Sequence, residues 1–136
     1  MKIEVDDKEV LNKLDDVQQM KLKNALTQCC LWVMNDARKK CPVDIGTLRN
    51  SITFEVYDDY GEVGTNLEYA PYVEFGTGKF AVNGDGRKTR WSYQDEEGNW
   101  HSTLGQEPQP YLVPALDENR GVIELTLKAC LDEVVR

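Results

Sequence analysis

Residues 41–56, CPVDIGTLRNSITFEV, mark the point where the periodicity of this chain changes. No proline or glycine precedes Pro42, and apolar residues between Leu22 and Ala37 recur at steps of three and four, which is typical of an amphipathic helix. Within 52–56 every second residue is apolar. The stretch therefore predicts a long N-terminal helix that stops at the proline and is followed by a half-buried strand.

The N-terminal helix is expected to begin near Asp6 or Asp7, either of which can act as its cap, with Glu9 placed to complete a capping box. A helix of about 33 residues would be about 50 Å long. That length exceeds a compact domain of this size, whose radius of gyration is about 14 Å. We therefore expect a break near residues 17–20, or a helix end that a neighbouring subunit covers.

Residues 58–61 predict a turn, and residues 62–65 the strand that returns from it. The short apolar run 72–75 fits either a strand or a helical turn. Residues 79–107 form an excursion that contains a predicted β-hairpin, with its aromatic residues paired across the strands on one face. A last helix follows, with Pro114 in its first turn.

The predicted fold class is α+β, with a long N-terminal helix and a C-terminal helix packed on a small antiparallel sheet and with an inserted β-hairpin. A length of 136 residues fits a single domain, 1–136, in which 79–107 is an inserted flexible loop and hairpin. The net charge of −8 argues against nucleic-acid binding, which depends on Lys and Arg. No apolar run reaches the length of a membrane span, and the N-terminus does not resemble a signal peptide, so we expect a cytoplasmic protein.

No group of residues predicts catalysis. His101 is the single histidine and is expected to be an exposed strand residue, while Cys29, Cys30, Cys41 and Cys130 lack the spacing of metal ligands and are expected to be reduced, buried thiols. We expect no enzyme activity, no cofactor and no metal. A small hydrolase that uses Cys41 or His101 is an alternative that loss of activity on a single substitution would reveal.

Three segments combine proline and glycine with aromatic and aliphatic residues: 42–52, 69–78 and 108–116. Their selected positions, which we expect to hold a shape or to form an assembly surface, are Pro42, Asp44, Gly46, Leu48, Arg49, Tyr72, Glu74, Phe75, Gly76, Thr77, Gly78, Pro108, Pro110, Tyr111 and Pro114.

Individual roles are expected at some of these positions. Asp44 can accept amide hydrogens in an Asx-type turn, and Gly46 would supply the positive φ that such turns often need. Leu48 is expected in the core, and Arg49 is expected to form a structural ion pair with Glu74. The aromatic residues of the three segments are more often core residues, although aromatic residues on loops also serve as anchors of assembly surfaces.

In order and spacing, CPVDIGTLRNSI, YAPYVEFGTG and PQPYLVPAL resemble the gp-ten-like morphogenesis family of long-tailed bacteriophages and prophages, which are tail-completion and head–tail joining proteins. The resemblance extends over residues 1–136, with Ile45 where threonine is commoner and Tyr111 where phenylalanine is. The excursion GRKTRWSYQDEEGNWHSTLGQ is similar to a hairpin inserted in versions from prophages of Gram-positive bacteria.

The resemblance implies a non-enzymatic virion protein, assembled in the host bacterial cytoplasm, which completes the tail or neck at the head–tail junction. It implies a homo-oligomeric ring around the DNA channel and contacts with tail-tube, terminator and head-completion proteins. An acidic lumen would let DNA slide without trapping it. The alternative is a prophage-encoded soluble adaptor or inhibitor that binds a host protein, which would form a one-to-one complex and have no tail phenotype.

Overall fold

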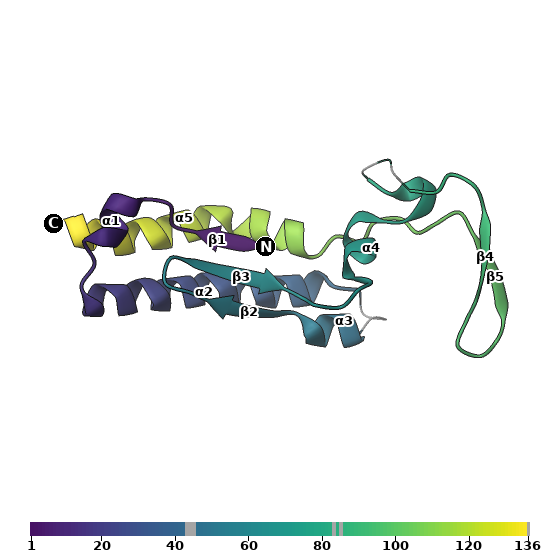
Figure 1. Cartoon of the computed structure of the whole chain (residues 1–136), viewed down its shortest axis with the longest axis horizontal. Helices are drawn as coiled ribbons and strands as arrows, with labels where there is room; N and C mark the ends of the chain where they lie inside the picture. The colour runs from purple at the N-terminus through teal and green to yellow at the C-terminus, as the bar shows by residue number, and fades with distance from the viewer. Residues whose placement is uncertain (43–45, 83, 85, 136) are drawn as a thin grey trace. The chain divides into compact units, whose positions relative to one another are not determined.

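A computed structural model describes residues 1–42, 46–82, 84 and 86–135, and it divides into two compact units (Figure 1). We call Met1–Thr65 with Tyr111–Arg136 the helical unit, and Asn66–Pro110 the hairpin unit. The single domain expected over residues 1–136 stays a prediction, because two compact units do not tell whether each folds alone.

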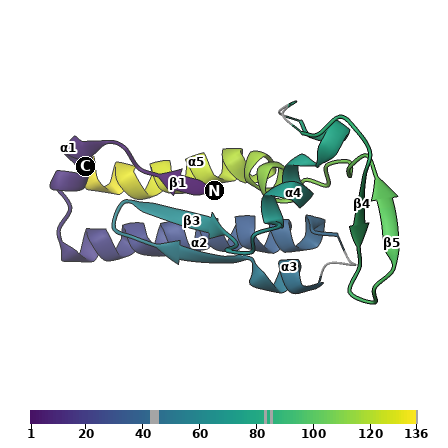
Figure 2. The ribbon, with the colours of Figure 1, turned by 45° about the vertical axis from the view of Figure 1, so that its right-hand side comes forward.

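The helical unit contains two long helices that run antiparallel and lie side by side in both views (Figures 1 and 2). Its elements are β1 (Lys2–Glu4), α1 (Lys8–Asn12), α2 (Asp16–Lys40), α3 (Gly46–Ser51), β2 (Thr53–Val56), β3 (Tyr60–Gly64) and α5 (Leu112–Val135). Asn119 Nδ2 on α5 donates to Asp36 Oδ2 on α2 at 2.6 Å, and Lys40 Nζ pairs with Glu118 at 2.8 Å. These contacts tie the end of α2 to the first turns of α5.

The three strands of the helical unit form an antiparallel sheet in the order β1–β3–β2, and β2 and β3 pack on α2. The register sets Lys2 opposite Glu62 and Phe54 opposite Val63. Because side chains alternate across a strand, Val63 turns into the core, whereas Glu62 faces outward. The fold is therefore α+β, as predicted, with long helices packed on a small antiparallel sheet.

The core of the helical unit is formed by apolar side chains of α2 and α5 together with those of the sheet and α3. Fully or nearly fully buried members are Ile3, Leu22, Leu26, Cys29, Cys30, Val33, Ala37, Leu48, Ile52, Val63, Tyr111, Ala115, Ile123 and Leu127.

The N-terminal region differs from the expected single helix. The break lies at residues 13–15, earlier than the predicted 17–20, because Asp15 starts a new helix with a capping box. The Asp15 side chain accepts a hydrogen bond from the Gln18 amide at 2.8 Å, and the Gln18 side chain accepts one from the Asp15 amide at 3.1 Å. Asp7 caps the short α1 by accepting from the Val10 amide. The strand β1, which precedes both helices, was not predicted.

The hairpin unit contains α4 (Ala70–Phe75), the 3-10 helix η1 (Gly78–Phe80), β4 (Trp91–Gln94) and β5 (Trp100–Thr103). The run 72–75, which fitted either a strand or a helical turn, is helical. The predicted hairpin is confirmed, and its stacked pair is Tyr93 with His101, whose ring centroids lie 5.3 Å apart. The expectation that all aromatic residues share one face is wrong for Trp100, because it lies opposite Gln94, on the other face.

Two smaller predictions concern the hairpin β2–β3 and the start of the last helix. The returning strand begins at Tyr60, two residues earlier than expected, because the Tyr57 amide donates to the Tyr60 carbonyl at 2.7 Å and closes a tighter turn around residues 58–59. Pro114 lies in the first turn of α5, as predicted, where its missing amide hydrogen costs no helical bond.

Candidate functional site

The first motif segment terminates α2 and places α3. Cys41 leaves helical geometry with φ −62° and ψ 136°, as a residue before proline should, and thereby confirms the predicted stop at Pro42. Leu48 is fully buried, also as predicted. Asp44 lies outside the described residues. Gly46 opens α3 and is not among the glycines with positive φ, so the positive φ expected at this position is wrong.

Arg49 has a structural contact within the helical unit. Its Nη2 donates to the Cys41 carbonyl at 3.2 Å, which ties α3 back to the end of α2. Its Nε is buried without a hydrogen-bond partner in the described part of the chain. Glu74, the expected partner of Arg49, is a buried residue of the hairpin unit. The ion pair between them stays a prediction.

The second and third segments meet inside the hairpin unit. The Thr77 amide donates to the Gln106 carbonyl at 3.0 Å, and Thr77 Oγ1 accepts from the Gln106 amide at 2.8 Å. The Gln109 amide, between Pro108 and Pro110, donates to the Val73 carbonyl at 2.8 Å. The chain that returns from the excursion is therefore hydrogen-bonded both to α4, at Val73, and to the segment just after α4, at Thr77.

Gly76 and Gly78 are required by this close approach. Both have positive φ, +80° and +60°, a region that favours glycine. A Cβ at Gly76 would lie 2.9 Å from the Phe80 carbonyl oxygen and 3.0 Å from Pro108 Cδ. These two glycines therefore serve the close packing of two backbone segments.

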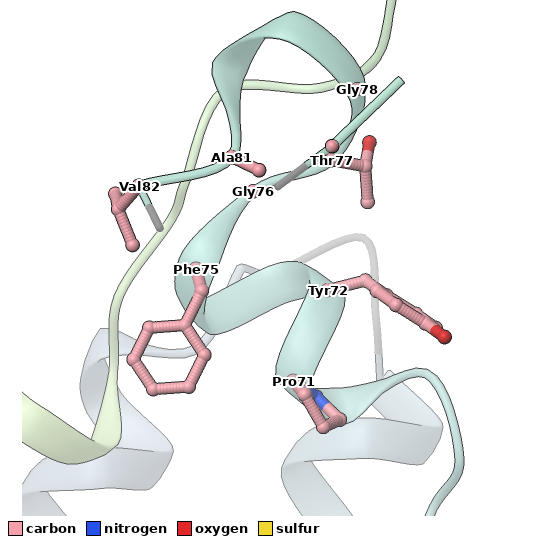
Figure 3. A pocket seen from close by; sticks show the side chains of 9 residues that line it. Pro71, Tyr72, Phe75, Gly76, Thr77, Gly78, Ala81 and Val82 are labelled. Atoms are coloured by element: carbon pink, nitrogen blue, oxygen red, sulfur yellow. The ribbon is translucent and has the colours of Figure 1, made fainter. Parts of the chain in front are cut away.

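A pocket of about 330 Å³ opens beside α4, and the second motif segment forms most of its wall (Figure 3). Tyr72, Phe75, Thr77 and the two motif glycines line it, together with Pro71, Ala81, Val82 and Gly86. Tyr72 is 60% exposed, Phe75 41% and Val82 60%. The core role expected for these two aromatic residues is therefore wrong, whereas Tyr111 in the helical unit is fully buried.

Pro71, Ala81, Val82 and Gly86 were not among the positions predicted from the sequence. Val82 carried a usable signal, because it ends a short apolar run, Phe80-Ala81-Val82, inside the predicted excursion. Tyr69, at 38% exposure, adds a further exposed aromatic residue next to α4. We call the three exposed residues that line the pocket, Tyr72, Phe75 and Val82, the α4 surface. Exposed apolar side chains of this kind are typical of docking surfaces.

The residues considered for chemistry have other environments. His101 lies on β5 as an exposed strand residue, and its Nε2 is 2.7 Å from Asp95 Oδ2. Cys29, Cys30 and Cys41 are buried and Cys130 is half-buried, and burial raises the pKa of Cys29 and of Cys30 to about 11. Such thiols are poor nucleophiles at neutral pH, because little thiolate is present. Within the described ranges, no group of three or more His, Cys, Asp or Glu side chains is placed to hold a metal ion.

A family model described as "Bacteriophage HK97-gp10, putative tail-component" matches residues 8–76, just over half of the chain. The chain belongs to this HK97-gp10-like family, and the family resemblance of the sequence is thereby confirmed. The comparison with curated proteins and the comparison with solved structures each gave no match.

Membership of this family makes the protein a phage tail-associated structural component that works with other virion proteins. The matched range contains the first motif segment and most of the α4 surface, whereas the β4–β5 hairpin and the third segment lie beyond it. No helix in the described part of the chain has a stretch long and apolar enough to cross a membrane.

Proposed function

We propose that this tail component completes the tail or neck at the head–tail junction, as one subunit of a ring around the DNA channel. The observation that carries the proposal is the α4 surface, because an exposed aromatic pair lies there on a motif segment inside the range matched by the family. Buried aromatic anchors contribute much of the affinity of protein interfaces. Tyr72 and Phe75 are therefore the side chains that would be buried on assembly.

The local rigidity of the α4 surface supports docking. The hydrogen bonds of Thr77 with Gln106 and of Gln109 with Val73 hold α4 and the segment after it against the returning chain. A surface that is ordered before binding loses less conformational entropy when it binds. The partners that fit this role are the tail-tube, terminator and head-completion proteins, with further copies of this chain in the ring.

The charge of the chain suits a position beside DNA. With a net charge of −8, the protein repels phosphates, so a ring lined by its carboxylates would let DNA pass without holding it. The role needs no cofactor and no catalysis. It places the protein in the virion after assembly in the host bacterial cytoplasm.

Light scattering tests the proposal, first on the protein alone and then with purified tail-tube or terminator protein. We expect a ring, or a monomer that enters a larger assembly only with the partner. Replacing Tyr72 and Phe75 together by alanine should abolish that assembly. Trp100→Ala is the matched control, because Trp100 is also an exposed aromatic residue, at 70%, but lies outside the matched range.

Two results would contradict the proposal. One is an assembly that survives loss of both α4 anchors, and the other is a protein that ignores every tail protein. A stable one-to-one complex with a host protein, together with normal tails, would establish the adaptor or inhibitor alternative instead.

A further inference from the structure

A second surface, in the helical unit, has the features of a docking groove. It is a groove of about 380 Å³ between the N-terminal segment 4–10 and the second half of α5. Figures 1 and 2 both show α1 beside that part of α5. We call it the α5 groove. It lies apart in sequence from the α4 surface, and it does not depend on the function proposed above.

The floor of the α5 groove is apolar. Val5 and Leu127 are nearly fully buried beneath it, and Val10 and Leu131 are half-buried at its sides. Leu125, which follows Glu124 on α5 and is 69% exposed, does not line the groove. Val10 and Leu131 still expose apolar surface in the groove, and a partner that covers them removes this surface from water, which is favourable.

The rim of the α5 groove is acidic. It carries five carboxylates, three from the segment 4–7 and two, Glu124 and Asp132, from α5, against the single ammonium of Lys128. Among the described residues, Asp6 and Glu124 have no ion-pair partner within 4.0 Å. Such a rim repels nucleic acid and acidic segments and attracts lysine and arginine.

We propose that the α5 groove binds a basic amphipathic helix of a partner protein. The apolar side of that helix would cover Val10 and Leu131, and its lysines or arginines would meet the rim carboxylates. The groove residues of α5 recur at 124, 127, 128 and 131, so one face of this helix forms a wall of the groove, and a second helix can pack on such a face. Recognition of this kind combines apolar anchors in a groove with charge pairing at its edge.

The test uses a fluorescently labelled synthetic peptide of leucine and lysine, with the leucines on one helical face. Fluorescence anisotropy should show saturable binding that weakens as salt is added, because rim charges are screened. Glu124→Lys should weaken binding about five- to tenfold, since an attractive contact becomes a repulsive one. Glu9→Lys is the matched control: Glu9 is an exposed acid on α1 that does not line the groove, and its reversal should change affinity less than about twofold.

A second peptide, in which serine replaces every leucine, tests the apolar floor and should bind far more weakly. Circular dichroism should confirm that both protein variants keep their helices. Equal losses from Glu124→Lys and Glu9→Lys would overturn the proposal, because the attraction would then come from the overall charge. The proposal would also be overturned if the serine peptide bound as well as the leucine peptide, or if neither peptide bound. Self-association of the protein that Glu124→Lys removes would overturn it too, because the groove would then bind a second copy of this chain.

Discussion

Gly61 lies on β3 opposite Ile3 and Val56, where the sheet packs on Cys30 of α2. A Cβ built on it would overlap Cys30 Sγ, closer than the 3.0 Å that real Cβ contacts respect, and would lie 3.6 Å from the Glu55 carbonyl oxygen. Gly61→Ala should therefore force the sheet and the helix apart or drive the Cys30 side chain into a filled core.

Two opposing effects set the size of the change. Overpacking a filled core costs about 1–3 kcal/mol. Alanine also restricts the unfolded chain, which stabilises the fold by about 0.4–1 kcal/mol at a position without positive φ. Overpacking is larger, so we expect a net loss of about 1–2 kcal/mol in the free energy of unfolding. For a chain of this size the midpoint of thermal unfolding should fall by about 3–8 °C.

Urea unfolding followed by circular dichroism measures this loss, with Gly64→Ala as the control. Gly64 lies on the same strand, but no atom lies within 4 Å of its added Cβ, so its replacement should be neutral or slightly stabilising. Cys30→Ala removes the overlapping sulfur, and the double variant should lose less stability than the two single losses together. Equal effects at Gly61 and Gly64, or strictly additive losses in the double variant, would refute the packing argument.

The remaining predictions concern ionisable groups. The hydrogen bond from His101 contributes most to lowering the pKa of Asp95, and the bond from the Asn99 amide comes next. This carboxylate should therefore stabilise the hairpin at pH values above about 3.9, which is the pKa in the unfolded chain. The stabilisation should be lost as the pH falls through the lower pKa of the folded state. An NMR titration in which Asp95 protonates at or above the ordinary value would contradict this. Cys29 and Cys30, with pKa values raised to about 11 by burial, should resist alkylation at pH 8 until denaturant is added. Mass spectrometry should find the half-buried Cys130 labelled first, and labelling of all three at one rate would show that the core is open.

The elements that sequence periodicity predicted are those with local signals. The long α2, the hairpin of β2 with β3 and the final α5 each follow from a repeat of apolar residues and a nearby stop or turn. The stop before Pro42 is of this kind, since proline excludes helical geometry from the residue before it. The capping box of Asp15 with Gln18 was also visible in the sequence, but an earlier pair of acids offered a competing start.

What could not be predicted depends on contacts between distant parts of the chain. The strand β1 has only three residues, and its partner Glu62 is far away in sequence from Lys2. The exposure of Tyr72 and Phe75 likewise depends on tertiary packing, since an apolar helical turn has the same sequence pattern whether it is buried or exposed.

The motif glycines illustrate the same limit. Gly76 and Gly78 were predicted as part of a segment that holds a shape. Glycine is required there because the returning chain at residues 104–108 lies against both positions, and this contact has no signal in the local sequence. Gly46, by contrast, proved to be an ordinary first residue of α3. A glycine in a motif therefore predicts an unusual backbone only where another part of the chain approaches it.

Electron microscopy of particles from bacteria whose phage or prophage lacks this gene tests the joining role most directly. The proposed function predicts that filled heads and separate tails accumulate, and that the wild-type gene restores complete particles whereas the variant lacking the Tyr72 and Phe75 side chains does not. Complete, infectious particles formed without the gene would contradict it.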